Sequence, residues 1–292
     1  MSALLLSLLV HYNNMNANAN TFVPRDQNNN NTTVISNNIN DSSNSSKPII
    51  SSFNNNNNTS SKSKSNENKR YFAIDVECVC TGYTHNDRVV AQIAICDIDM
   101  GTLLNVFVLN PEDEKKIVSC ITPLTGIDRG KLQREGIPFA DAMVLVRRCI
   151  PRENSVLVGQ NVAKDIEWLQ LKEGVDFGAI VDLAGVWRTW NPKFKTFSVF
   201  SQDHLIRTLL ADKHEMGETH DAIGDAVKSM KLFALWRELH IDPKRLEKEK
   251  EKLLEKEPEP SFAKRFPSYE GVCMGNRKTC TCNAPFLDDD DA

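Results

Sequence analysis

The sequence lacks an apolar run long enough to cross a membrane, because its most apolar stretch, residues 4–10, falls far short of the roughly 20 residues that a spanning helix needs. It also lacks an excess of positive charge, since 35 Lys and Arg stand against 39 Asp and Glu and leave a net charge of −4. Eight cysteines in 292 residues are too few for a disulfide scaffold. These absences argue against a membrane protein, a polycation that coats long nucleic acid and a small disulfide-rich domain.

Composition divides the chain into three predicted parts. Residues 1–69 are rich in Asn, Ser and Thr, and we expect them to be disordered because they cannot bury enough apolar surface. Residues 70–240 carry continuous apolar periodicity and suit one domain. Residues 241–292 contain a helix of alternating charge at 243–257, followed by a cysteine-containing tail that ends in the acidic run 288–291.

Two flanking segments have alternative interpretations. The charged helix has few apolar anchors, so we interpret it as a solvated spacer, with coiled-coil pairing as the alternative. Residues 4–10 resemble the apolar core of a signal peptide, but no Lys or Arg precedes them. We expect an intracellular protein of the cytoplasm or nucleus with no membrane partner; a targeting segment in the arm is the alternative.

The tail carries three potential thiolate ligands for zinc, Cys273, Cys280 and Cys282. A tetrahedral structural zinc site needs four protein ligands, and no histidine follows His240 to supply the fourth. The sequence therefore favours free or occasionally oxidised surface thiols over a zinc site.

Periodicity in the central region predicts an alternation of strands and helices. Three strands come first and indicate an antiparallel meander, at residues 71–79, 89–97 and 102–109. Further strands are expected at 155–159 and 179–183, and helices at 139–149, 162–171, 201–210 and 220–239. This order predicts an α/β fold in which helices flank a mixed five-stranded sheet.

Carboxylates occur at unusual places in these apolar elements. Asp75 and Glu77 are two residues apart in the first strand, so they project from the same face. Two acids side by side in a core strand repel each other unless a cation lies between them. Asp165 begins a predicted helix, and Asp225 lies in the last one. Four such acids would together bind two divalent cations through the hard oxygen ligands that magnesium prefers.

A histidine precedes the last of these acids. His220 lies five residues before Asp225, near the same end of the helix. A histidine at a helix start is usually a cap or a surface residue, but here it would lie within reach of an attacking water and could act as general base. Asp182 and Asp221 are also near, and we interpret them as a strand-end residue and a helix N-terminal acid.

In chain order, these residues resemble the three motifs of the DEDDh superfamily of ribonuclease H-like 3′-to-5′ exonucleases, namely Asp75-x-Glu77, Asp165 after Gly-Gln-Asn-Val-Ala-Lys, and His220-x4-Asp225. The resemblance covers about residues 70–240 and includes the segments Arg-Val-Val-Ala-Gln-Ile-Ala from residue 88 and Leu-Thr-Gly-Ile from residue 124. The Asp-Val-Glu-Cys and Val-Gly-Gln-Asn blocks are more similar to the branch that trims RNA 3′ ends than to polymerase proofreading subunits.

The resemblance implies a ribonuclease H-like fold and a two-metal hydrolysis that releases nucleoside 5′-monophosphates from RNA 3′ ends. Asp75, Glu77 and Asp225 would hold one cation, Mg²⁺ or Mn²⁺, while Asp165 together with Asp75 would help to position the second. His220 would take a proton from the attacking water. The alternatives are a DNA exonuclease of the same chemistry and a catalytically idle module that binds nucleic acid.

Aromatic and cationic residues alternate between residues 187 and 195. This mixture stacks bases and pairs with phosphates in proteins that bind single strands. We therefore expect substrate contacts from Trp187, Arg188, Trp190 and Lys193, with burial of the tryptophans in the core as the alternative.

Overall fold

The computed structural model describes residues 69–210 and 220–286, which all belong to one compact unit. Nearly all of the predicted N-terminal arm and the acidic run at the end of the tail lie outside the described residues. Among the helices of the described residues, none has both the length and the apolar character that a membrane span requires.

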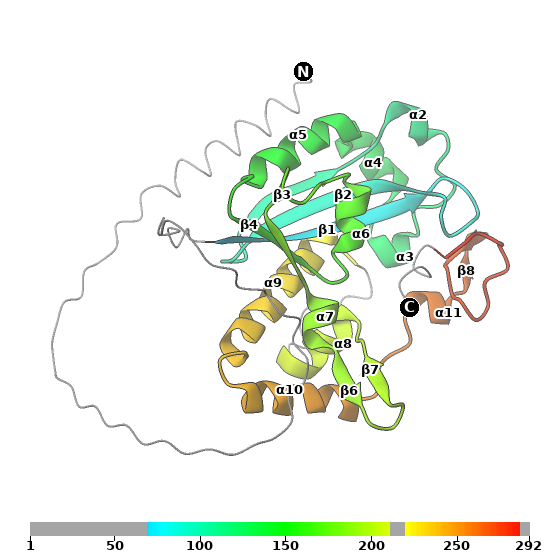
Figure 1. Cartoon of the computed structure of the whole chain (residues 1–292). Helices are drawn as coiled ribbons and strands as arrows, with labels where there is room; N and C mark the ends of the chain where they lie inside the picture. Colours follow the sequence, from blue (N-terminus) through cyan, green and yellow to red (C-terminus); the bar gives the residue numbers. More distant parts are fainter. Residues whose placement is uncertain (1–68, 211–219, 287–292) are drawn as a thin grey trace, which may run out of the picture. The chain divides into compact units, whose positions relative to one another are not determined.

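A mixed five-stranded sheet forms the centre of this unit (Figure 1). Its strands are β1 (Arg70–Cys80), β2 (Arg88–Asp97), β3 (Thr102–Phe107), β4 (Ser155–Gly159) and β5 (Ala179–Asp182), and their order across the sheet is β3-β2-β1-β4-β5. The first three strands form an antiparallel meander, and β4 and β5 continue the sheet in parallel with β1. The predicted fold is confirmed, and each strand boundary lies within two residues of its expected position.

Three helices expected from the sequence are present: α5 (Phe139–Cys149), α6 (Ala163–Trp168) and α9 (Ala222–Leu239). The helix expected at 201–210 is one turn of α-helix, α8 (Gln202–Leu205), continued by the π-helical segment Ile206–Leu210. Five short helices among the described residues show too little of a periodic pattern and are not predicted: α2 (Pro111–Glu114), α3 (Thr122–Thr125), α4 (Arg129–Glu135), α7 (Leu183–Trp187) and α11 (Phe262–Arg265).

Helices cover both faces of the sheet, with α9 and α5 on opposite sides (Figure 1). On the α9 side, Ala73 and Ala94 of the sheet belong to the same buried cluster as Ala226 of the helix. Alanine at these positions leaves room for a close approach between helix and strand. On the other side, Val79 and Ala91 pack in a separate cluster with residues before and within α4. The sheet is therefore buried on both faces.

The charged helix α10 (Pro243–Glu255) packs against the central unit, so the prediction of a solvated spacer is wrong. Leu253 is buried in the core cluster of α9, and its carbonyl oxygen accepts a hydrogen bond from His204 Nε2 at 3.0 Å. Lys250 Nζ donates to the carbonyl oxygen of Arg188 at 3.3 Å. Leu246 also packs against this cluster. The partners of both leucines are distant in sequence, so local patterning does not reveal the contact.

The C-terminal segment folds back onto the loop between β1 and β2. It contains α11 (Phe262–Arg265) and a small hairpin of β8 (Ser268–Tyr269) and β9 (Val272–Cys273). Phe262 and Val272 pack with Cys80 and Ile121 in one buried cluster. The backbone N–H of Cys273 donates to the carbonyl oxygen of Tyr83 at 2.9 Å.

Candidate active site

The central strand presents its two carboxylates toward α9. Asp75 and Glu77 share a face of β1 with Ala73, and Ala73 packs with Ala226 of α9. A β-bulge follows at Glu77 and Cys78, where Glu77 pairs with Gln92 of β2 but Cys78 pairs with Val90. Ala91 of β2 is the residue that this register skips, and Val79, which follows the bulge in β1, packs with Ala91 in the cluster on the other face of the sheet.

Two more carboxylates reach the same region from helix starts. Asp165 lies in the first turn of α6, which follows β4, and Asp225 lies in the first turn of α9. Their exposed fractions are 9% and 6%, so both are buried. The electrostatic neighbours of Asp75 are Asp165, Asp225 and Glu77, which confirms that strand and helices converge on one place.

Burial and mutual repulsion make these acids hard to ionise. Burial, together with the charges of Asp165 and Asp225, holds the pKa of Asp75 well above its usual range. Burial raises the pKa of Glu77 to about 8, although His220 beside it acts in the opposite direction. Burial also raises the pKa of Asp165 to about 8. Three carboxyl groups of the site therefore lack sufficient positive charge from the protein.

Asp225 differs from the other three acids because it has two cationic partners. His220 Nδ1 lies 2.8 Å from Oδ2 of Asp225, and Lys228 Nζ donates to Oδ1 at 2.8 Å. Burial alone would raise the pKa of Asp225, but these two partners outweigh it and the pKa is lowered. The same hydrogen bond raises the pKa of His220. Lys228 is only 7% exposed and also lies 3.5 Å from Asp203 Oδ1.

The residues fit a divalent cation. Ligand atoms of Glu77, His220 and Asp225 all lie within 4.8 Å of one another, and Asp75 is an electrostatic neighbour of both acids. Carboxylate oxygens are the donors that Mg²⁺ and Mn²⁺ prefer. A cation at this place would also compensate the buried charges that raise the pKa values of Asp75 and Glu77. The chemistry of the donor set therefore matches hard divalent metals.

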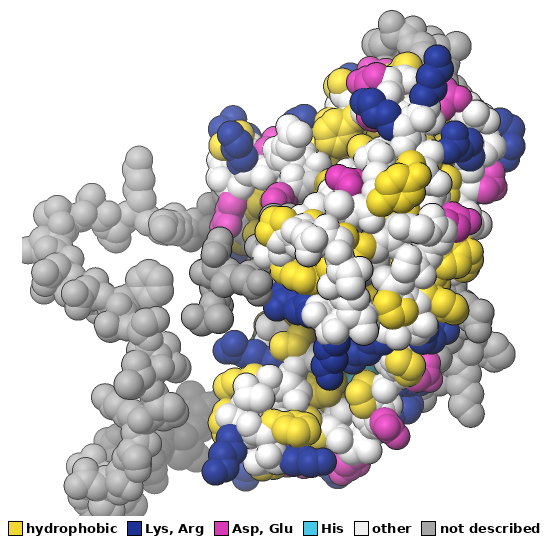
Figure 2. Space-filling model, turned by 90° about the vertical axis from the view of Figure 1, so that its right-hand side faces the viewer, with side chains coloured by type: hydrophobic (Ala, Val, Ile, Leu, Met, Phe, Trp, Pro, Cys, Tyr) yellow, Lys and Arg dark blue, Asp and Glu magenta, His cyan; other side chains and the backbone are white. Residues whose placement is uncertain are grey.

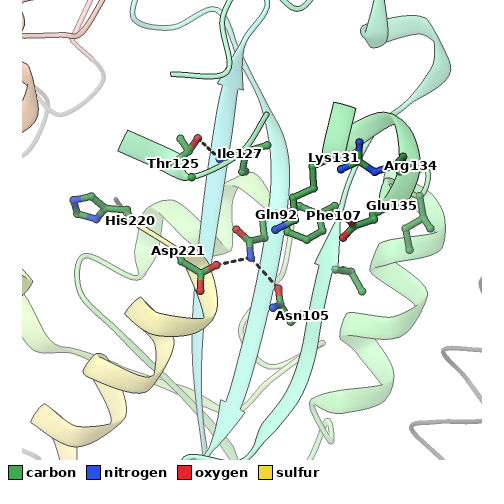
Figure 3. A pocket seen from close by; sticks show the side chains of 13 residues that line it. Gln92, Asn105, Phe107, Thr125, Ile127, Lys131, Arg134, Glu135, His220 and Asp221 are labelled. Carbon is green, nitrogen blue, oxygen red and sulfur yellow. Dashed lines mark hydrogen bonds between the residues drawn. The ribbon is translucent and has the colours of Figure 1, made fainter. Parts of the chain in front are cut away.

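A cavity of about 700 Å³ adjoins the histidine (Figure 3). His220 and Asp221 lie on one side of it, and Lys131 and Arg134 of α4 lie on the other. Gln92 lies between them, where its Nε2 donates to Asp221 Oδ1 at 2.8 Å and to Asn105 at 2.9 Å. A cavity of this size is large enough for a nucleotide.

Comparisons with known proteins agree with this architecture. The chain is 29% identical to RNA exonuclease 4 of Dictyostelium discoideum over 106 residues, which are 36% of this chain and 33% of that protein. No family model matches the sequence. The catalytic unit of Neurospora crassa Pan2, with protease and nuclease domains, has a similar structure with a TM-score of 0.53, 16% identity and coverage of 66% of this chain and 31% of that one.

A Saccharomyces cerevisiae Pan2 module, a pseudoubiquitin hydrolase with an RNA exonuclease in complex with AAGGAA RNA, is also similar. Its TM-score is 0.52 at 16% identity, and the match covers 66% of this chain and 33% of the module. The described part of the chain therefore shares the α/β fold of these Pan2 nuclease modules. The chain spans about a third of the length of the relatives that it matches.

Within this exonuclease fold, all five predicted catalytic residues come together. The four acids and His220 arrive from β1, α6, α9 and the residue pair that precedes α9. Asp182 ends β5 and caps α7 through a hydrogen bond from the Ala184 N–H at 2.8 Å, as expected for a strand-end residue. Asp221 is the N-cap residue of α9, also as expected.

The prediction that Trp187 contacts the substrate is wrong. Its side chain is 1% exposed and lies in the core cluster that also contains Phe233 and Leu253. The indole adds a large apolar surface to the core that residues of α9 and α10 also enter, which is the ordinary use of tryptophan in a core.

The other three residues of that prediction lie on the surface. Trp190 belongs to β6 (Thr189–Asn191), which pairs with β7 (Thr196–Ser198), and Lys193 lies in the turn between them. Trp190 packs edge-on against Phe197 with ring centroids 5.4 Å apart, and the Arg188 guanidinium lies over Phe197 at 4.9 Å. The hairpin is beside α10 in Figure 1. Contact of these residues with RNA stays a prediction.

Three features of the site are not found from the sequence. Lys228 has one local signal, since it follows Asp225 by three residues and so lies on the same helix face. Gln92 and the α4 pair Lys131 and Arg134 have none, because their relation to His220 depends on how the sheet and α4 pack.

We expect divalent-cation binding to strengthen as the pH rises from about 6 to 8. Glu77 and Asp165 have pKa values of about 8 without metal, so at pH 6 a cation must displace their protons. The apparent affinity for Mn²⁺ should rise about tenfold per pH unit for each proton displaced. Calorimetric titration with Mn²⁺ in two buffers of different ionisation enthalpy measures the number of protons released on binding. A pH-independent affinity without proton release would contradict it.

Proposed function

We propose that the protein is a metal-dependent 3′-to-5′ exoribonuclease that removes nucleoside 5′-monophosphates one at a time from single-stranded RNA. The observation that carries the proposal is the convergence of Asp75, Glu77, Asp165 and Asp225 beside His220, in a fold shared with RNA exonucleases. Four neighbouring acids that repel one another, two of them buried and two half-buried, have no stabilising role in a fold, but they have a clear use in holding cations.

The acids divide between two cation positions in this proposal. Asp75, Glu77 and Asp225 would hold one Mg²⁺ or Mn²⁺, and Asp165 together with Asp75 would help to hold the second. When bound, the cations supply Lewis-acid stabilisation of the charge that develops on the scissile phosphate.

His220 acts as general base. Its Nδ1 is held by Asp225 Oδ2 at 2.8 Å, so the imidazole is oriented and its Nε2 takes the proton of the attacking water. Asp203 Oδ2 lies 4.0 Å from Nε2, and its charge contributes to the raised pKa of the ring. A carboxylate that holds one ring nitrogen, here Nδ1, fixes the orientation of the ring and leaves the other nitrogen for proton transfer.

The cavity next to His220 would hold the 3′-terminal part of the strand, with Lys131 and Arg134 placed to meet its phosphates. The face shown in Figure 2 also carries a band of Lys and Arg side chains across its lower half, which suits contact with a phosphate backbone. RNA is favoured over DNA because the relatives with matching fold are named as RNA exonucleases and one was solved in complex with RNA.

The test is a time course of the purified full chain on 5′-labelled single-stranded RNA and on the matching DNA. The full chain is needed because Leu253 of α10 is part of the core. We expect a ladder that shortens from the 3′ end with Mg²⁺, vanishes with EDTA and forms faster on RNA. Faster shortening of DNA would favour the DNA exonuclease, and binding of RNA without shortening would favour the idle module.

A further inference from the structure

A second cluster of potential metal ligands lies outside the carboxylate site. His85, in the loop between β1 and β2, meets Cys273, Cys280 and Cys282 of the C-terminal segment. His85 Nδ1 lies 3.1 Å from Cys282 Sγ, 3.6 Å from Cys280 Sγ and 3.8 Å from Cys273 Sγ. The Sγ atom of Cys280 lies 3.5 Å from those of Cys273 and Cys282. All four ligand atoms lie within 4.8 Å of one another.

These distances are the edges of a metal tetrahedron. Zinc bonds of about 2.3 Å to sulfur and about 2.0–2.1 Å to nitrogen give edges of about 3.8 Å between sulfurs and about 3.6 Å between sulfur and nitrogen. A disulfide would bring two sulfurs to about 2.05 Å, and all three thiols are free. The side chains are thus arranged around a common centre rather than paired with each other.

We propose that His85, Cys273, Cys280 and Cys282 form a structural zinc site. Four protein ligands complete a tetrahedron and leave no open position, which distinguishes a structural site from a catalytic one. Three thiolates and an imidazole select zinc over Mg²⁺ or Mn²⁺, which prefer oxygen ligands. The cysteines therefore do not behave as the free surface thiols that the sequence favoured, because the fourth ligand comes from 188 residues before Cys273.

The surroundings of the cluster also suit a metal site. His85 Nε2 lies 3.2 Å from the carbonyl oxygen of Pro285, an acceptor that keeps the ring proton on Nε2 and leaves the lone pair of Nδ1 for the metal. The backbone N–H of Gly275 points at Cys273 Sγ at 3.5 Å. Asn86 Nδ2 donates to the same Pro285 carbonyl oxygen at 2.8 Å, which fixes the position of the acceptor.

Zinc at this place would stabilise segments that contact the candidate active site. The hairpin that carries Cys273 packs through Val272 against Cys80 and Ile121, and Leu124 lies against the same cluster. The carbonyl oxygen of Leu124 accepts the backbone N–H of His220 at 2.5 Å. The segment 262–286 has almost no core of its own, and small segments of this kind depend on a metal to stay folded.

The test measures zinc in the full chain, purified without chelator. We expect about one zinc per wild-type chain after dialysis against Mg²⁺, and loss of that zinc in Cys280→Ser and His85→Ala. Cys149→Ala is the matched control, because Cys149 is a buried thiol of α5 away from the cluster, and it should keep the zinc. Asp75→Asn should also keep it, which separates this site from the carboxylate site.

Cobalt exchange into the wild-type protein keeps the test independent of how the variants fold. We expect thiolate-to-cobalt charge-transfer bands and the strong ligand-field bands of tetrahedral Co²⁺, at one equivalent. Zinc content unchanged by Cys280→Ser, absence of the thiolate bands, or a disulfide among the three cysteines in freshly purified protein would each overturn the proposal. None of these readouts depends on nuclease activity.

Discussion

Asp75→Asn is expected to abolish nuclease activity while making the metal-free protein more stable. Asp75 is surrounded by Asp165, Asp225 and Glu77, and burial with these charges holds its pKa well above the usual range. A carboxyl group whose pKa is higher in the folded protein than in the unfolded chain makes the protein less stable as the pH rises from the unfolded pKa to the folded pKa. At pH 7 the ionisation of such a group therefore opposes folding. The neutral amide removes that repulsion and should add about 1–2 kcal/mol to the free energy of unfolding in EDTA.

The expected activity falls, because the amide no longer offers a charged ligand to either of the two proposed cations. A loss of several kcal/mol of transition-state stabilisation corresponds to about 10³-fold or more in rate. Urea unfolding in EDTA and RNA shortening with Mg²⁺ measure the two effects on one preparation. Retained activity, or a less stable metal-free protein, would contradict this account of Asp75.

Asp225→Asn is the matched comparison. It should also inactivate the enzyme, but it removes the nearest charged partner of the buried Lys228 and of His220. The more distant Asp203 remains, at 3.5 Å from Lys228 Nζ and 4.0 Å from His220 Nε2. Breaking one side of a buried ion pair costs about 3 kcal/mol or more, so this variant should unfold at lower urea concentration than wild type. Opposite stability changes with the same loss of activity would show that the two acids have different electrostatic partners, as the structure describes.

His220→Ala is expected to lower kcat by about 10²- to 10⁴-fold, the usual contribution of a general base. RNA binding should change little, because the cavity keeps Lys131 and Arg134. His240→Ala is the control, since His240 is an exposed histidine at the opposite end of α9 and should leave kcat unchanged. Single-turnover shortening of labelled RNA gives the rate, and filter binding with EDTA gives the affinity.

The pH profile separates a base from a merely structural histidine. The hydrogen bond to Asp225 raises the pKa of His220, so the wild-type rate should fall on the acidic side as the ring is protonated. In His220→Ala there is no imidazole to protonate, so the pH dependence of the remaining rate should reflect only the pH dependence of metal binding. If His220→Ala keeps the full wild-type fall of the rate at low pH, another group accepts the proton.

The strands and the four acids of the candidate site are predictable from the sequence because their signals are local. A strand repeats every two residues, so the spacing of Asp75 and Glu77 is enough to assign both to one face. The positions of Asp165 and Asp225 follow from helix starts next to apolar runs, and the structure has both acids in first helical turns.

Other features depend on which segments meet, and local patterns do not contain that information. Trp187 has the same neighbours in sequence as an RNA-stacking residue, but the packing of α9 and α10 buries it. In the sequence, Leu253 is an apolar residue within a charged helix, but in the structure its side chain is buried in the core. His85 has no metal-site signal in its own segment, since its cysteines belong to the far end of the chain.

The contact between His85 and Cys273 also has a consequence for biosynthesis. The two residues are 188 positions apart, and ribosomes add about 5–20 residues per second. Cys273 is therefore synthesised about 10–40 s after His85. The antiparallel meander can form during that interval, whereas the loop between β1 and β2 meets its cysteine partners only after residues 273–282 have left the ribosome. Premature termination shortly before Cys273 would release a chain that has all five proposed catalytic residues but lacks the cysteines that contact His85.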